Sequence, residues 1–262
     1  MPKRINVSDF DLAASLMCGQ AFRWSAGTDG WFTGVVGQRV CRLRQTGKLL
    51  EGDIDPHYLG LDVSLLDIVA TFPDDDVLQQ AVRQHWGVRV LRQEPWETLA
   101  SFIASSTKQI VQIRQIVENL ARRFGQPLGN DAFSFPDAAT IAGATLPQLR
   151  ACKLGFRAEY LLAAARMVDR DELRLNKLPA LEYERALEEL TKIHGVGEKI
   201  ANCTLLFSLG FDQAFPVDVW MQRALHRLGW RGKKITRRQV LDHFGPYAGW
   251  AQQYLFFSER SR

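Results

Sequence analysis

Lys199 and Asp218 are the residues whose type and position best suit covalent chemistry. Lys199 follows a Gly-Val-Gly sequence at 195–197 and lies in the first turn of an expected helix. The positive end of the helix dipole and partial burial disfavour an ammonium there, which favours a neutral, nucleophilic amine. Asp218 is expected to cap a later helix. Singly, the two are also explained as a phosphate-binding lysine and a plain capping aspartate, but the pair in this order favours a reactive site.

The glycines before Lys199 indicate a tight turn between two helices. Apolar residues at helical spacing precede them, at 187, 190 and 193, and follow them, at 200, 201, 205 and 206. Such a turn leaves backbone N–H groups exposed at a helix N-terminus, where the helix dipole also attracts anions. The segment is typical either of a phosphate-binding helical hairpin or of an ordinary hairpin whose glycines serve packing.

The elements that must position these residues differ between the two halves of the chain. Short segments rich in aromatic or β-branched residues, separated by turn formers, predict strands at 21–24, 31–36, 40–44 and 48–51. Helices are expected at 65–71 and 76–86, the second starting at Asp74-Asp75-Asp76. From Pro95 onward the apolar spacing is helical, with a helix start at Thr145-Leu146-Pro147.

These patterns predict an α+β fold with two domains. We expect a small antiparallel β-sheet domain with helices over residues 1–92. An all-helical domain with short loops, which contains the helical hairpin, is expected over residues 93–262.

The composition excludes several classes of protein. The 262 residues are 46% hydrophobic and 24% charged, which is typical of a globular protein rather than a disordered one. No apolar run reaches the roughly 18 residues that span a membrane, and no secretory signal is expected at the N-terminus. The four cysteines are too far apart to indicate a disulfide framework, a zinc site or an iron–sulfur cluster. We therefore expect a cytoplasmic protein whose cysteines are small buried hydrophobes.

Basic residues concentrate in one interval although the net charge is only +4. The chain between Asp218 and Asp242 contains no carboxylate and seven cations: Arg223, Arg227, Arg231, Lys233, Lys234, Arg237 and Arg238. A run of one sign indicates either a surface that faces a polyanion or a solvated basic face that binds nothing.

The motif Gly195-Val196-Gly197-x-Lys199, followed by Pro216-Val217-Asp218, resembles the helix-hairpin-helix Gly/Pro…Asp superfamily of DNA base-excision glycosylases. Within it the chain is similar to the 8-oxoguanine DNA glycosylase/lyases of eukaryotic type, in a short form that looks bacterial. The resemblance extends over nearly the whole chain, through the segments 19–24, 87–93, 101–106, 154–157 and 245–252.

The resemblance implies a bifunctional enzyme that flips 8-oxoguanine out of duplex DNA and excises it. Lys199 matches the lysine that displaces the base, forms a Schiff base and then cleaves the strand by β-elimination. Asp218 matches the aspartate that stabilises positive charge on the sugar. The pocket for the flipped base is matched by Gly19, Cys203, Gln252 and Phe256. Gly19 corresponds to the glycine whose carbonyl accepts the N7–H of 8-oxoguanine, which guanine lacks.

The same resemblance assigns residues to the DNA. Arg157 matches an arginine that holds the cytosine left behind, and Phe156 matches an aromatic wedge. The expected hairpin contacts are Gly195, Val196 and Gly197, while Trp220 stands where eukaryotic relatives have a histidine near the flipped phosphate.

Three departures from the family pattern alter these expectations. Gln112 replaces a second cytosine-reading arginine, and Thr107-Lys108-Gln109 replaces a run of asparagines. Because a bidentate arginine contact contributes about 1–3 kcal/mol of discrimination, we expect cytosine to be less strictly required opposite the lesion. His194 replaces the proline that usually opens the hairpin and is interpreted as a structural variant.

Two other functions would account for part of the same sequence pattern. A monofunctional alkylbase glycosylase would share the layout and the aspartate but lack the lysine. A non-catalytic helix-hairpin-helix module would bind the DNA backbone without using Lys199, Asp218 or Phe256. The resemblance implies no organic cofactor, although hairpin carbonyls in this superfamily can hold a cation. The expected partner is double-stranded DNA containing 8-oxoguanine, bound by a monomer, with no membrane involved.

Overall fold

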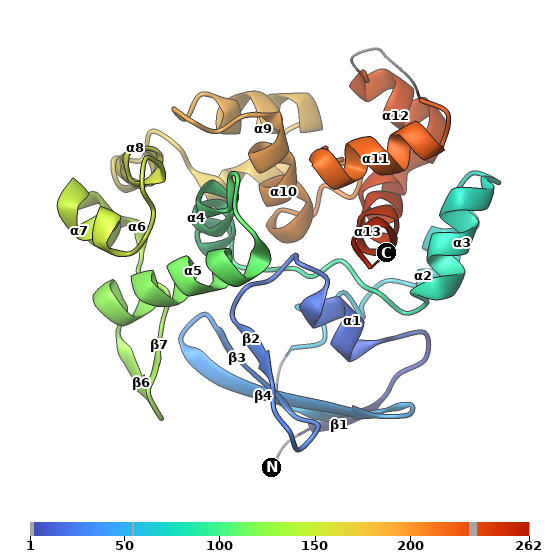
Figure 1. The fold of residues 1–262 in the computed structure, drawn as a ribbon, viewed down its shortest axis with the longest axis horizontal. Coiled ribbons are helices and arrows are strands. Elements are labelled where there is room, and N and C mark those ends of the chain that lie inside the picture. The colour runs from blue at the N-terminus through green and yellow to red at the C-terminus, as the bar shows by residue number, and fades with distance from the viewer. Residues whose placement is uncertain (1–2, 54, 231–234, 262) are drawn as a thin grey trace.

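The N-terminal part of the protein is a five-stranded antiparallel sheet (Figure 1). The computed structural model describes residues 3–53, 55–230 and 235–261. The strands are β1 (Lys3–Asn6), β2 (Trp24–Ala26), β3 (Phe32–Val36), β4 (Arg39–Thr46) and β5 (Leu49–Gly52), in the spatial order β1-β5-β4-β3-β2. Along β4, Cys41 and Leu43 are buried while Arg42 is exposed, which confirms the predicted alternation of a half-buried strand.

The sheet differs from the prediction at its start. β1 and the short helix α1 (Leu12–Met17) were not expected, and the prediction of a strand over 21–24 was wrong except at Trp24. The reason is that Phe22 belongs to the hydrophobic core formed mainly by the helices. Its neighbours in this segment therefore pack between the sheet and the helices instead of forming a strand.

Two helices follow the sheet in the chain but lie beside the C-terminal helix. α2 (Leu65–Ala70) and α3 (Asp76–Gln84) confirm the two predicted helices. Asp75 caps α3 by accepting from the N–H groups of Val77 and Leu78, as the run of aspartates indicated. In Figure 1 both helices lie beside α13 (Ala248–Arg260), and α3 packs directly against it. The domain boundary between residues 92 and 93 stays a prediction.

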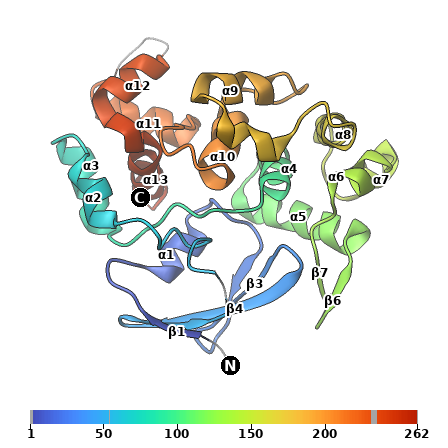
Figure 2. The same ribbon diagram turned by 180° about the vertical axis from the view of Figure 1, so that it is seen from behind.

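The rest of the chain is mostly helical (Figure 2). In chain order its elements are α4 (Pro95–Ser105), α5 (Ile110–Phe124), β6 (Pro127–Gly129), β7 (Ala132–Phe133), α6 (Ala138–Ala142), α7 (Leu146–Ala151), α8 (Arg157–Asp169), the 3-10 helix η1 (Leu175–Ala180), α9 (Tyr183–Thr191), α10 (Glu198–Ser208), α11 (Val219–Arg227), α12 (Arg237–Phe244), η2 (Gly245–Tyr247) and α13. The predicted entry to α7 is confirmed, because Thr145 caps it in a reciprocal arrangement with Gln148.

The hairpin of β6 and β7 corrects the expectation that this half contains helices alone. Its two-residue turn holds Asn130 and Asp131 at φ angles of 50° and 58°. Asparagine and aspartate tolerate this left-handed conformation, and such turns match the twist of paired strands. The Gly-Asn-Asp sequence at 129–131 was therefore the signal for a hairpin.

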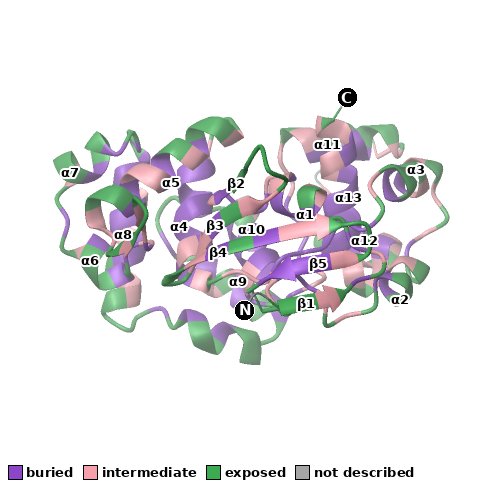
Figure 3. Cartoon of the chain, turned by 90° about the horizontal axis from the view of Figure 1, so that it is seen from below, coloured by how far each residue is buried: buried purple, intermediate pink, exposed green. Residues whose placement is uncertain are grey.

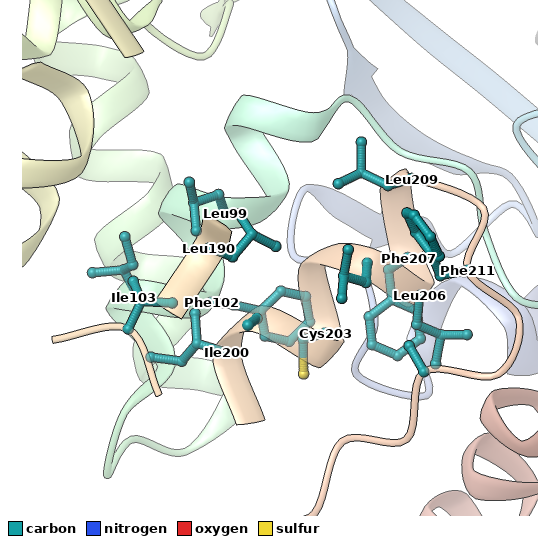
Figure 4. Close-up of a cluster of buried hydrophobic side chains, with 14 of the residues drawn as sticks. Leu99, Phe102, Ile103, Leu190, Ile200, Cys203, Leu206, Phe207, Leu209 and Phe211 are labelled. Carbon is teal, nitrogen blue, oxygen red and sulfur yellow. The ribbon is translucent and has the colours of Figure 1, made fainter. Parts of the chain in front are cut away.

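The core of the helical part forms where α4 and α10 cross. Figure 4 shows Leu99, Phe102 and Ile103 of α4 near Ile200 and Cys203 of α10, and the Phe102 ring stacks on Phe207 of α10 with centroids 5.5 Å apart. Figure 3 shows buried residues concentrated along these inner helices and exposed ones along the outer faces of α6 and α7. All four cysteines are buried and free, which confirms their interpretation as small core residues. Among the described residues, no helix is long and apolar enough to cross a membrane.

Candidate active site

One cavity of about 820 Å³ collects the predicted catalytic and base-pocket residues. Its walls come from the turn after α1, the end of α4, the start of α5, and from α10, α11 and α13. Figure 1 places these elements around the centre of the molecule. Eight residues singled out from the sequence line this cavity: Gly19, Thr107, Lys199, Cys203, Asp218, Trp220, Gln252 and Phe256. Residues far apart in the sequence therefore share one site.

Lys199 enters the cavity from the first turn of α10. Its Nζ lies 3.3 Å from the Oγ of Ser105 and 5.0 Å from the ring centroid of Phe102. The Ser105 hydroxyl donates to the Phe102 carbonyl at 2.7 Å, so its lone pairs are available to the lysine. Helix periodicity places Cys203 on the same face one turn later. Burial raises the pKa of the Cys203 thiol to about 11, against a smaller lowering by the nearby Lys199 charge.

Asp218 combines a structural and a cavity position. Its Oδ1 accepts from the N–H groups of Trp220 at 3.0 Å and Met221 at 2.9 Å, which caps α11 as predicted. The same carboxylate lines the cavity with Lys199. Capping orients it and leaves it half-exposed to a bound molecule.

Helix α13 supplies a polar and an aromatic group to the cavity. Gln252 and Phe256 are four residues apart and therefore lie on one face of the helix. The Gln252 side chain is buried, and its Oε1 has no hydrogen-bond partner in the described part of the chain. A buried amide oxygen without a partner is costly unless a ligand satisfies it. This arrangement favours recognition of a polar, planar molecule.

Gly19 forms a turn in which a side chain does not fit. Its φ angle is +101°, and an added Cβ would lie 2.7 Å from Ile110 Cδ1 and 3.5 Å from Phe256 Cε1. Both the backbone conformation and the close approach require glycine here. The turn therefore brings a main-chain segment against the aromatic wall of the cavity.

Phe156, Arg157 and Gln112, which were predicted to contact DNA, lie outside this cavity, whereas Thr107 lines it. Phe156 is 53% exposed at the start of α8, as a residue that enters DNA must be. Arg157 is buried, stacks on the Phe156 ring at 4.4 Å, and donates to the carbonyls of Ser106 and Leu154. Its guanidinium also donates to the hydroxyl of Thr107 at 2.6 Å. Gln112 is exposed, and its Oε1 accepts from the Gln109 N–H at 3.2 Å, which caps α5.

The hairpin between α9 and α10 has the predicted tight turn. Gly195 has a φ of +83°, and an added Cβ would lie 2.2 Å from the Tyr160 ring. Val196 is buried, and Gly197 precedes α10 without a side-chain cap. His194 packs edge-to-face on Tyr160 with ring centroids 5.0 Å apart, in keeping with its interpretation as a structural residue.

The basic interval is partly neutralised by the fold. Arg227 pairs with Glu259 at 3.0 Å, Arg237 with Glu198 at 3.2 Å and Arg238 with Asp242 at 2.8 Å. Arg223 stacks on Trp220 at 4.7 Å. Arg231, Lys233 and Lys234 lie outside the described residues, so the choice between a polyanion-binding and a solvated face stays open.

Sequence reasoning missed several residues of the cavity wall. The polar ones to which no role in the site was assigned are Ser105, Ser106, Lys108, Gln109, Gln222, Gln253 and Arg260. A signal existed for Arg260, because it follows Gln252 and Phe256 at the same four-residue spacing. In the described ranges 3–53, 55–230 and 235–261, no group of three His, Cys, Asp or Glu residues could hold a metal ion.

Comparison with known proteins identifies the class. The sequence model of the HhH-GPD superfamily of base excision DNA repair proteins matches residues 100–247. That of the 8-oxoguanine DNA glycosylase N-terminal domain matches residues 4–54 and 51–99. The chain therefore belongs to the HhH-GPD superfamily and carries the N-terminal domain typical of 8-oxoguanine DNA glycosylases.

Individual members of this class resemble the chain over nearly its whole length. The chain is 31% identical to an N-glycosylase/DNA lyase of Saccharomyces cerevisiae, over 97% of this chain and 85% of the relative. It is 34% identical to MBOgg1 in complex with a low-affinity DNA ligand, covering 98% and 95% of the two chains with a TM-score of 0.93. It is 29% identical to the Clostridium acetobutylicum 8-oxoguanine glycosylase/lyase bound to double-stranded DNA with cytosine opposite 8-oxoG, covering 100% and 98% with a TM-score of 0.92.

Proposed function

We propose that this protein excises 8-oxoguanine from duplex DNA and then cleaves the abasic strand, with Lys199 as the nucleophile. It is a DNA N-glycosylase with abasic-site lyase activity. The observation that carries the residue assignments is the single cavity in which Lys199 and Asp218 meet the four base-pocket residues. Full-length similarity to N-glycosylase/DNA lyases favours this bifunctional enzyme over an alkylbase glycosylase or a non-catalytic DNA-binding module.

The chemistry follows from an amine and a carboxylate at one sugar. The Lys199 Nζ gives up a proton and attacks C1′ of the flipped nucleotide, the C1′–N9 bond breaks, and its electron pair and a proton leave with the base. Asp218 stabilises the positive charge that develops on the sugar, and it does so more strongly in a desolvated site than in water. The nitrogen lone pair then forms the C=N bond of a protonated Schiff base while the C1′–O4′ bond breaks and the ring oxygen takes up a proton. Loss of a C2′ proton expels the 3′ phosphate, which cleaves the strand.

The pocket residues account for base selection. The Gly19 carbonyl accepts the N7–H of 8-oxoguanine, and guanine would leave this acceptor without a partner. Gln252 binds the pairing edge through its unpartnered amide oxygen. Phe256 and Cys203 enclose the faces of the base, and the high pKa of the thiol keeps Cys203 neutral there.

The partner is duplex DNA, and we propose that the surface next to the cavity binds it. Phe156 fills the space left by the flipped base, and Arg157 binds the cytosine after exchanging its bonds to Ser106 and Leu154. The N–H groups of Gly195, Val196 and Gly197 bind phosphate at the start of α10, and Trp220 contacts the flipped nucleotide. Thr107 and Gln112 face the opposite strand. We propose that the protein acts as a monomer on the DNA of the cytoplasm or nucleoid and needs no organic cofactor. The backbone carbonyls of the hairpin are where a cation would bind.

Borohydride trapping tests the nucleophile directly. A duplex with 8-oxoguanine opposite cytosine is incubated with wild type, Lys199→Gln and the surface control Lys177→Gln, each with borohydride. We expect a covalent adduct with wild type and Lys177→Gln and at least a thousandfold loss with Lys199→Gln, because reduction fixes only a Schiff base.

The contrary outcomes are specific. Base release without any adduct would indicate a monofunctional enzyme that depends on Asp218. An adduct that survives Lys199→Gln but disappears in Lys108→Gln would assign the nucleophile to the other lysine of the cavity wall.

A further inference from the structure

Arg260, which the proposed chemistry does not use, holds the turn that carries Gly19. It lies in the last turn of α13 and lines the cavity. Its Nη1 donates to the Cys18 carbonyl at 3.0 Å. A Cβ added to Gly19 would lie 2.9 Å from the same Nη1. The guanidinium therefore packs against Gly19 and binds the peptide group immediately before it.

The chain on the other side of Gly19 is anchored by Gln20. Its carbonyl accepts from Gln93 Nε2 at 2.9 Å. Its side-chain amide bonds three backbone groups, which are those of Ser15, Arg89 and Leu91. Glycine has a soft backbone, so the direction of its carbonyl depends on how the flanking peptides are held. Gln20 is held as the residue after Gly19, and Arg260 holds the peptide group before Gly19.

A second guanidinium reaches the same turn from α5. Arg114 donates to the Trp24 carbonyl, and its Nη2 lies 3.4 Å from Met17 Sδ. Burial lowers the pKa of Arg114, and the positive charge of Arg260 lowers it further. Each guanidinium donates to one backbone carbonyl, that of Trp24 for Arg114 and that of Cys18 for Arg260, and a hydrogen bond from a charged donor is stronger than a neutral one.

We infer that Arg260 is a positioning residue that fixes the Gly19 carbonyl in the direction that accepts the N7–H of flipped 8-oxoguanine, an inference that rests on the proposed function. Gln252, Phe256 and Arg260 repeat every four residues, so one face of α13 carries both the base contacts and the anchor of the opposite wall. Arg260 acts through Gly19 and takes no part in the Schiff-base chemistry of Lys199.

The test separates base recognition from lyase chemistry. Single-turnover rates are measured at saturating enzyme on two duplexes, one with 8-oxoguanine and one with a preformed abasic site, both opposite cytosine. The proteins are wild type, Arg260→Met, Arg260→Lys and the control Arg174→Gln, which removes an exposed arginine that pairs with Asp171. We expect Arg260→Met to excise 8-oxoguanine at least tenfold more slowly while nicking the abasic duplex within twofold of wild type. Arg260→Lys restores part of the excision rate, and Arg174→Gln matches wild type on both duplexes.

Each remaining outcome has a definite reading. Unchanged excision by Arg260→Met, or equal losses on the two duplexes, would overturn the positioning role, since a merely structural defect affects both reactions. A wild type that nicks abasic DNA but never releases 8-oxoguanine would instead overturn the proposed substrate, and the positioning role with it.

Discussion

The reactivity of the site is decided by what surrounds the Lys199 amine. Cys203 is the competing nucleophile one turn away, and a thiolate would be the more reactive group. Burial raises the pKa of this thiol to about 11, however, so the sulfur stays protonated at neutral pH. The amine has a hydroxyl oxygen at 3.3 Å and an aromatic ring beneath it. These contacts support the proposal that Lys199, rather than Cys203, is the nucleophile.

We expect the single residue Gln112 to influence which base is accepted opposite 8-oxoguanine. Gln112 is exposed and uses its Oε1 to cap α5, and an amide there lacks the paired donors of an arginine. We expect Gln112→Arg to raise the ratio of excision opposite cytosine to excision opposite adenine about fivefold or more, because a bidentate contact contributes about 1–3 kcal/mol. Excision rates with each of the four opposite bases measure this ratio.

The control for this change is Gln112→Ala, which loses the same capping bond without adding donors. It should leave the ratio unchanged. If Gln112→Arg also left the ratio unchanged, or if wild type already excised 8-oxoguanine only opposite cytosine, the proposed relaxation would be wrong.

At the scale of elements, the hairpin between α9 and α10 contains two glycines, Gly195 and Gly197, that are needed for different reasons. Gly195 has a positive φ and lies against the Tyr160 ring, whereas an added Cβ at Gly197 would meet nothing within 4 Å. The first glycine is required by space and backbone conformation, while the second leaves room in front of the first N–H groups of α10.

Alanine substitutions should separate these duties. We expect Gly195→Ala to lower the free energy of unfolding by about 2–4 kcal/mol, through backbone strain and overlap with Tyr160. Gly197→Ala, at a φ of −90°, should change it by less than about 1 kcal/mol. Urea unfolding followed by circular dichroism measures both values. Equal losses would show that the Tyr160 contact does not limit the turn.

At the scale of the whole molecule, Arg89 joins the N-terminal segment to the loop before α2. Its side chain is buried and donates to the carbonyls of Asp9, Gly60 and Val63. Its own N–H donates to the hydroxyl of Ser15 in α1. These bonds stabilise the segment that leads into the Gly19 turn.

Removing this guanidinium should weaken the whole fold. We expect Arg89→Met to reduce the free energy of unfolding by about 3 kcal/mol or more, because three carbonyls lose charged donors and stay largely buried. Arg83→Met, on the exposed face of α3, should change it by no more than about 0.5 kcal/mol. Thermal and urea unfolding compare the two variants. A similar stability for both would mean that water replaces the Arg89 bonds.

Local patterns in the sequence predicted much of the fold and of the cavity. Capping residues and apolar spacing located α2, α3, α7 and the helices of the hairpin, because these signals act within a few residues. The same four-residue spacing places Cys203 on the helix face of Lys199, whereas Gln252 and Phe256 were assigned through the family resemblance. The β6–β7 hairpin was not predicted, because its strands have only three and two residues. β1 and α1 were not predicted either, because their segments are also short.

The sequence alone determined the class of protein and the residue types of its chemistry, since these depend on composition, spacing and motif. Only the tertiary structure decided which residues share the cavity. Arg260 bonds Cys18 across 242 positions of the chain, and Ser105 reaches Lys199 across 94. No periodicity extends over such distances; these contacts exist because the packing of α4, α10 and α13 around one core brings the segments together.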